Sequence, residues 1–204
     1  MTRMVIHIAL AAFLLTAPLH PVLAVPQEGA PPNLRVQRIV DAAVEQTRVT
    51  IYYDPAYKRI PYPGGDVPLD RGVCTDVVVR AFRKVGIDLQ KEIHEDMQRN
   101  GAAYPRLWGL PNPDSNIDHR RVPNQMTYFR RHCEVLPNST AAADYRSGDV
   151  VAWRLTSGVL HIGIVMGSRS PSSGNRLVVH NIGAGAKLED VLFSWTVIGH
   201  YRCL

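Results

Sequence analysis

The chain has 204 residues, a formal net charge of +5 and 46% hydrophobic residues. No internal repeat or low-complexity linker divides it, so we expect one domain with its own core. It has no basic helix and no repeated platform of aromatic and arginine residues, which argues against a nucleic-acid partner. A mildly basic balance suits an anionic envelope polymer or simply a protein that stays in solution.

The first 24 residues are typical of a secretory signal peptide. Arg3 precedes an apolar run over residues 4–15, and Val22-Leu23-Ala24 offers a small-residue cleavage site. The run is shorter than the roughly 18 apolar residues that a membrane span needs. We therefore expect cleavage near Ala24, a single mature domain over residues 25–204, and a periplasmic or secreted monomer without a transmembrane segment.

Residues after the signal peptide begin with helical patterns. Apolar residues recur at the spacing of a helix with one buried face in four segments, 34–47, 74–86, 89–99 and 124–131. A short strand is predicted over 49–53 and a turn-rich loop over 54–65. The irregular stretch 104–123 is long for a compact domain, and its tryptophan, leucine and arginine content favours an ordered flap over a site.

The last third of the chain changes to strand patterns. Four apolar runs separated by polar and glycine-rich connections predict strands over 150–153, 160–166, 177–181 and 196–201. Helices followed by a run of hairpin-connected strands indicate an α+β fold, with the helices packed on a C-terminal antiparallel sheet.

Cys74 stands where a loop turns into the second predicted helix. Unsatisfied backbone N–H groups and the helix dipole at such a position favour a thiolate. A free cysteine is, however, more often a small buried hydrophobe. The chain has three cysteines, an odd number for an oxidising compartment. We favour a disulfide between Cys133 and Cys203, because it would fasten the C-terminal tail and leave Cys74 free.

Two histidines lie at the ends of consecutive predicted strands. His161 begins one strand and His180 ends the next, so a hairpin would bring both to the same end of the sheet. A cysteine nucleophile needs a base, and the base needs a third group to orient it. Cys74, His161 and His180 therefore form a candidate catalytic set. The same three residues could also ligate zinc, but the chain has no HExxH or CxxC spacing, so we expect neither metal nor cofactor.

The predicted flap carries His119, Arg120 and Arg121 in succession. Binding residues concentrate on loops, so His119 is a candidate substrate contact. The two arginines could clamp a carboxylate-bearing substrate, although adjacent arginines on a loop are often only solvated.

Several landmarks resemble a known family in order and spacing. They are Pro61-Tyr62-Pro63-Gly64-Gly65, the helix-opening Cys74, Gly148-Asp149-Val150-Val151-Ala152-Trp153, His161-Ile162-Gly163-Ile164-Val165-Met166-Gly167 and Val178-Val179-His180. They resemble the NlpC-type cell-wall cysteine peptidases, a branch of the papain-like superfamily. The segment 116–124 is also similar to a secreted bacterial family labelled domain of unknown function 1287.

The resemblance implies roles for individual residues. Cys74 would be the nucleophile, His161 the base, His180 the third polar residue, and Tyr62 a tyrosine lining the site near the oxyanion. NlpC enzymes usually carry Asp-Cys-Ser, whereas this chain has Val73-Cys74-Thr75, which places the usual substrate in question.

Two further polar residues lie next to this set in the sequence. Asp76 is one of the two acids nearest to Cys74, and Asn181 directly follows His180. We expect both to contribute to substrate binding.

The function that follows is a cysteine hydrolase that cleaves an amide bond in peptidoglycan peptides or a related envelope peptide. A thiolate would attack the carbonyl, backbone N–H groups would bind the oxyanion, and His161 would protonate the leaving group. Two alternatives stay open: a non-catalytic envelope-binding module on the same fold, and a thiol acyltransferase that differs only in its acceptor.

Overall fold

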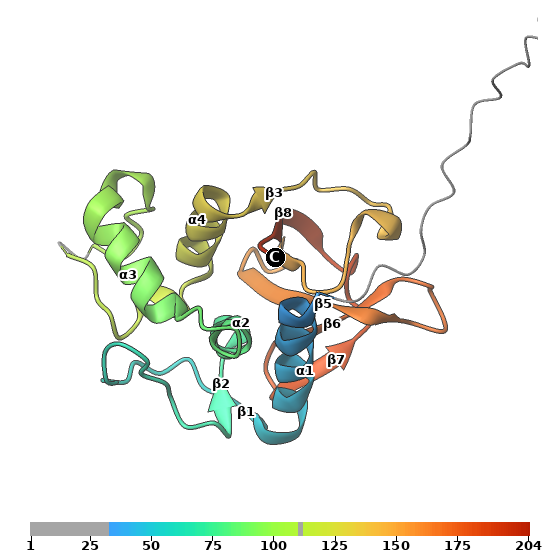
Figure 1. The fold of residues 1–204 in the computed structure, drawn as a ribbon, viewed down its shortest axis with the longest axis horizontal. Coiled ribbons are helices and arrows are strands. Elements are labelled where there is room, and N and C mark those ends of the chain that lie inside the picture. Colours follow the sequence, from blue (N-terminus) through green and yellow to red (C-terminus); the bar gives the residue numbers. More distant parts are fainter. Residues whose placement is uncertain (1–32, 110–111) are drawn as a thin grey trace, which may run out of the picture. The chain divides into compact units, whose positions relative to one another are not determined.

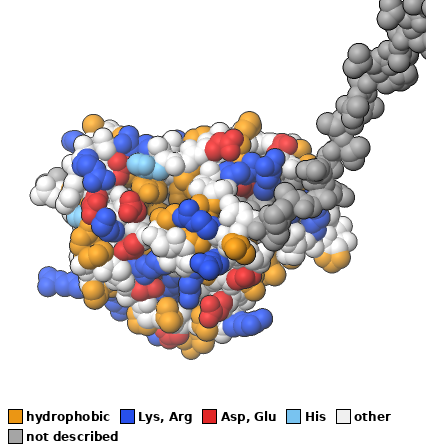
Figure 2. Space-filling model, viewed as in Figure 1, with side chains coloured by type: hydrophobic (Ala, Val, Ile, Leu, Met, Phe, Trp, Pro, Cys, Tyr) orange, Lys and Arg blue, Asp and Glu red, His pale blue; other side chains and the backbone are white. Residues whose placement is uncertain are grey.

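The computed structural model describes residues 33–109 and 112–204, which belong to one structural unit. The predicted signal peptide and its cleavage site near Ala24 lie outside the described residues. None of the helices in the described part of the chain is long and apolar enough to cross a membrane. On the face drawn in Figure 2, basic and acidic side chains are interspersed, and neither sign dominates.

Four α-helices form in the described ranges, close to where the apolar spacing predicts them. They are α1 (Leu34–Val49), α2 (Cys74–Arg83), α3 (Leu89–Asn100) and α4 (Val122–His132). Asn33 caps α1 by accepting a hydrogen bond from the Arg35 backbone N–H. Asp88 caps α3 in the same way through Gln90. Such side-chain caps satisfy N–H groups that have no partner within the helix. Single 3-10 turns follow at Gly101–Ala103, Asp118–Arg120 and Ala142–Asp144.

The strands form two sheets. The larger has the order β3-β8-β4-β5-β6-β7, and every neighbouring pair in it is antiparallel. Its strands are β3 (Glu134–Val135), β4 (Val150–Arg154), β5 (Leu160–Arg169), β6 (Arg176–Asn181), β7 (Ala186–Glu189) and β8 (Thr196–Arg202). A two-stranded parallel sheet joins β1 (Tyr52–Tyr53) to β2 (Arg71–Gly72). The predicted α+β architecture is confirmed, while β2, β3 and β7 have no counterpart among the predicted strands.

Both faces of the large sheet are buried, because its central strands alternate between two clusters. Ile162 and Ile164 of β5 pack with Val77, Phe82 and Phe129 of the helices in the larger cluster. Figure 1 shows α1 and α2 lying over this side of β5 and β6. The opposite face packs a second, smaller cluster composed of Tyr145, Val151, Trp153, Val165, Val178 and Leu192. His161, the second residue of β5, pairs with Trp153 of β4 and lies beside its ring.

A disulfide joins the end of α4 to the C-terminal tail. Cys133 and Cys203 are bonded, their Cα atoms lie 4.6 Å apart, and 70 residues separate them. Cys74 is the free cysteine. The bond closes most of the sheet into a single loop, which restricts the unfolded chain.

Replacing both bonded cysteines by serine should lower the free energy of unfolding by about 4 kcal/mol, because a loop of this length gives up that much chain entropy when it is closed. Urea denaturation of the double variant measures the loss. Wild-type protein in reductant is the matched control and should show the same stability as the double variant. Equal stability of oxidised wild type and variant, or a peptide map that finds Cys74 in the bond, would contradict the assignment.

Candidate active site

Cys74 is the first residue of α2, and Asp76 fixes the start of that helix. The Asp76 carboxylate accepts a hydrogen bond of 2.7 Å from the Val73 backbone N–H. Val73 is extended, so the chain passes directly from β2 into the helix. Gly72 is required here, because a Cβ on it would lie 2.9 Å from Asp76 Oδ2. The backbone on either side of Cys74, the candidate nucleophile, is therefore fixed by the hydrogen bond between Val73 and Asp76.

Arg120 completes this support. Its Nε and Nη2 donate to the Asp76 carboxylate at 2.9 and 3.0 Å, and their side chains are only 2% and 4% exposed. The same guanidinium donates to the backbone carbonyls of Asp54 and Ala56. We expected Asp76 and Arg120 to bind substrate. The structure pairs them with each other, while Arg120 also lines the Cys74 pocket and keeps one Nη1 hydrogen free among these contacts.

Asn181 has a similar internal role. It is fully buried, and its Nδ2 donates to the Gly72 carbonyl at 3.0 Å. This bond ties the end of β6 to the segment that leads into Cys74. Asn181, which we expected to contact substrate, therefore joins the end of β6 to β2, two residues before Cys74.

His161 and His180 come together on the neighbouring strands β5 and β6. His161 Nε2 lies 2.8 Å from His180 Nδ1, and both residues are buried. Gly163 makes this approach possible, because a Cβ there would lie 3.1 Å from the His180 Cβ. The rings of Trp153 and Trp195 lie 5.8 and 5.9 Å from the His161 ring. This aromatic wall limits how the His161 imidazole can turn.

Glu189 of β7 extends the pair into a chain of three. Its Oε2 lies 2.9 Å from His180 Nε2, which is an ion-pair distance. The angle between the two groups does not meet hydrogen-bond geometry. The carboxylate is 39% exposed and has room to rotate into line. Sequence reasoning missed Glu189 because it missed β7. The pairing of β6 with β7 that brings Glu189 beside His180 is visible only in the folded sheet.

The chain of contacts selects one tautomer for each imidazole. A carboxylate only accepts, so His180 presents Nε2–H to Glu189 and offers Nδ1 as an acceptor. His161 then donates Nε2–H to that Nδ1, which leaves its own Nδ1 as the basic nitrogen. His161 Nδ1 has no hydrogen-bond partner in residues 33–109 and 112–204. The arrangement prepares His161 to accept a proton at a defined atom.

Cys74 and His161 are both neutral in this structure. Burial raises the pKa of the Cys74 thiol to about 12, and the backbone N–H of Ile162 offsets only part of the rise. Burial lowers the pKa of His161 to about 3, with His180 adding to the shift. Helix-dipole stabilisation of a thiolate, worth about 0.3–1 kcal/mol, is too small to reverse burial. Within the described chain, no hydrogen bond joins Cys74 Sγ to His161.

A pocket of about 170 Å³ opens onto Cys74. It is lined by Tyr53, Pro55, Val73, Cys74, Ile117, Arg120, Val122 and Leu160. Burial raises the pKa of the Tyr53 phenol, so this tyrosine is a neutral hydroxyl beside the cysteine. Leu160 directly precedes His161, so the pocket lies where the cysteine helix meets the start of β5.

Tyr62 does not line this pocket, contrary to expectation. Its hydroxyl approaches Glu95 at 3.5 Å and its ring packs against His94, so it rests on α3. Tyr53, supplied by β1, is the tyrosine at the site. Both tyrosines were visible in the sequence, but nothing in their spacing distinguishes the one that folds beside Cys74.

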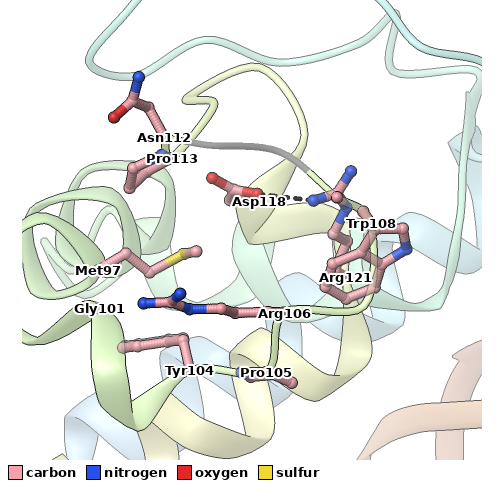
Figure 3. Close-up of a pocket in the computed structure, with 11 residues that line it drawn as sticks. Met97, Gly101, Tyr104, Pro105, Arg106, Trp108, Asn112, Pro113, Asp118 and Arg121 are labelled. Atoms are coloured by element: carbon pink, nitrogen blue, oxygen red, sulfur yellow. Dashed lines mark hydrogen bonds and ion pairs between the residues drawn. The ribbon is translucent and has the colours of Figure 1, made fainter.

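Neither His119 nor Arg121 lines the Cys74 pocket. His119 is 3% exposed, and burial lowers its pKa to about 4, so it is a neutral buried side chain. Arg121 pairs with Asp118 at 3.0 Å, and its guanidinium carbon lies 4.0 Å from the Trp108 ring centroid. Figure 3 shows this pair at a separate pocket of about 110 Å³. The structure therefore places His119 in the interior and Arg121 at this separate pocket.

The described residues contain no group of three or more His, Cys, Asp and Glu side chains placed to hold a metal ion.

Comparison with solved structures defines the class of fold. An N-acetylmuramoyl-L-alanine amidase from Bacteroides uniformis superposes with a TM-score of 0.52 and 12% identity, covering 83% of this chain and 98% of that one. NlpC1 from Trichomonas vaginalis gives a TM-score of 0.45 and 14% identity over 82% of this chain. This chain spans 43% of the length of that protein. The superposition on the amidase shows that the two chains share an α+β fold.

The chain belongs to the family described as domain of unknown function DUF1287, whose model matches residues 40–203. It is also 56% identical over 164 residues to the uncharacterized protein YijF of Escherichia coli strain K12, which covers 80% of each chain. The similarity to this family, first visible in the segment 116–124, therefore extends over nearly all of the described residues.

The tautomer assignment can be measured without a substrate, by nitrogen-15 NMR of the histidine rings. At pH 7 both His161 and His180 should be neutral Nε2–H tautomers. Because burial lowers the pKa of His161 to about 3, its neutral form should persist as the pH falls from 7 to about 4. Glu189→Gln should reduce the Nε2–H population of His180, because an amide can donate as well as accept.

Glu45→Gln, a change at an exposed glutamate of α1, is the matched control and should leave both spectra unchanged. A His161 that is protonated at Nδ1, or that titrates near its ordinary pKa of 6.5, would contradict the assignment.

Proposed function

We propose that this protein is a cysteine hydrolase that cleaves an amide bond in peptidoglycan peptides or a related envelope peptide. The observation that carries the proposal is the chain from Glu189 through His180 to His161, which leaves a free basic nitrogen at the strand end that borders the Cys74 pocket. A buried imidazole with both its tautomer and its orientation prepared is the arrangement that a general base requires.

The reaction begins from the neutral pair. His161 Nδ1 takes the thiol proton as Cys74 Sγ bonds to the amide carbonyl carbon, so charge separates only when substrate has closed the pocket. The backbone N–H groups of Cys74 and Thr75, which already help to lower the pKa of the thiol, are the nearest donors for the oxyanion. His161 then gives its proton to the leaving amine as the C–N bond breaks, and water hydrolyses the thioester.

The envelope assignment rests on two supports outside this geometry. The amidase from Bacteroides uniformis shares the fold, although a shared fold alone does not define a substrate. The signal-peptide pattern of residues 1–24 would deliver the mature domain to the periplasm or outside the cell. There it would act as a monomer without a cofactor.

One observation favours a second candidate, a non-catalytic module that binds envelope peptides on the same fold. Cys74 is 5% exposed, its pKa is raised to about 12, and its sulfur makes no hydrogen bond to His161 in the described chain. Reactive cysteines are commonly more exposed and have a lowered pKa. The two candidates differ in whether bound peptide is cleaved.

Soluble muropeptides, released from purified sacculi by a muramidase, are the test substrate. Incubation with the mature protein should yield products one water heavier in total than the substrate, as read by mass spectrometry. Cys74→Ala should abolish them, and His161→Ala should reduce the rate about 10²–10⁴-fold, the contribution typical of a general base.

Arg38→Ala, an exposed change on α1, is the control for purification and handling and should retain full activity. Absence of product with wild type, together with retained binding of the muropeptides, would reject the hydrolase and support the binding module.

A further inference from the structure

A second and larger groove lies next to the Cys74 pocket. It has a volume of about 460 Å³, within the range of sites that hold small ligands. The residues that line it are Ala103, Tyr104, Pro105, Pro123, Met126, Thr127, Arg130, Arg154, Leu160 and Ile198. Leu160 borders both hollows, and Pro123 of the groove directly follows Val122 of the Cys74 pocket. A substrate seated at Cys74 can therefore extend into the groove without leaving the protein surface.

Two arginines face this groove from different elements. Arg154 ends β4 and is paired in register with Leu160, one position from the pairing of Trp153 with His161. Arg130 lies near the end of α4, and its Nη2 donates to the Thr127 hydroxyl at 2.9 Å. Neither guanidinium forms an ion pair with a carboxylate of the described residues, in contrast to Arg120 and Arg121. Their positive charges are left for a group that comes from outside.

Arg154 also connects the groove to the histidine side of the sheet. It borders a further hollow, of about 510 Å³, that contains Trp195. The ring of Trp195 lies 5.9 Å from that of His161 and 6.1 Å from that of His180. Arg154 therefore shares a pocket with Trp195, whose ring lies beside both histidines.

Apart from Thr127, whose hydroxyl accepts from Arg130, the rest of the groove is mainly apolar. Met126 of α4 and Ile198 of β8 lie along it, with Tyr104 and two prolines at its borders. An apolar surface flanked by guanidinium groups suits a peptide with small apolar side chains and a free carboxylate, because Arg binds carboxylates through two parallel hydrogen bonds. A cationic or uncharged polar peptide would leave both arginines without a partner.

We propose that the groove between α4 and the ends of β4, β5 and β8 is a substrate subsite for a carboxylate-bearing peptide, with Arg154 and Arg130 as its carboxylate contacts. This inference rests on the proposed function, because a substrate subsite requires a reaction at Cys74. It adds the chemical class of the substrate. It assigns carboxylate binding to Arg130 and Arg154, which are far apart in the sequence. The flap residues Arg120 and Arg121 are instead paired with Asp76 and Asp118.

Binding of peptides to the Cys74→Ala variant, which lacks the proposed nucleophile, tests the subsite separately from catalysis. The probes are two preparations of the same soluble muropeptides, one with free carboxylates and one with the carboxylates converted to methylamides. Calorimetry should show at least 10-fold tighter binding of the carboxylate form. Adding Arg130→Ala and Arg154→Ala should remove that preference, and Arg154→Lys, which keeps the charge but loses the fork, should restore only part of it.

Adding Arg38→Ala to the Cys74→Ala protein makes the same charge change on α1 and should leave the preference intact. Circular dichroism and thermal melting identify any variant that fails to fold. If the alanine variants do not fold, the binding preference of the Arg154→Lys variant is the test. Equal binding of the two preparations, a preference that survives loss of both arginines, or no binding of either form would overturn the subsite. Failure of the hydrolase proposal has a different signature, namely normal selective binding without cleavage by the wild type.

Discussion

The buried ion pair between Asp76 and Arg120 is the constraint on which the rest of the site depends. The carboxylate holds the backbone at Val73, and the guanidinium holds the loop after β1 through two carbonyls. A single contact thus joins the helix that presents Cys74, the flap and the wall of the pocket. Removing one partner would leave a buried charge, at a cost of about 3–5 kcal/mol. This interaction explains why an arginine in a long loop is almost fully buried.

The second fixed element is the sheet end that carries the histidines. The absent side chain of Gly163 and the rings of Trp153 and Trp195 leave room for one arrangement of the two imidazoles. Asn181 ties this end to the cysteine segment. Catalysis then requires charge to develop between two groups that burial keeps neutral. In the proposed reaction, charge would separate only when a substrate fills the pocket, so the thiol would stay neutral, and less reactive toward oxidants, until then.

The sequence predicted the helices and the long strands well, because apolar periodicity follows directly from burial on one face or two. It failed for β7, a four-residue strand without an apolar alternation, and so failed for Glu189. It also assigned Asp76, Arg120 and Asn181 to substrate because they are polar and near the motifs. Their partners lie 44 and 109 residues away in the chain. Local patterns carry no information about pairings at that separation.

The central claim is that His161 takes the proton of Cys74, and the pH dependence of Cys74 alkylation tests it most directly. Iodoacetamide labelling of the native protein, followed by mass spectrometry, should proceed at a nearly constant rate between about pH 6 and 9, because the proton moves within the pair. His161→Ala should slow labelling at neutral pH at least 10-fold. If Cys74 were an isolated thiol with its pKa raised to about 12, its labelling would be slow at pH 7 and the rate would rise about 10-fold per pH unit. The His161→Ala change would then leave the rate unaltered. That second result would contradict the account.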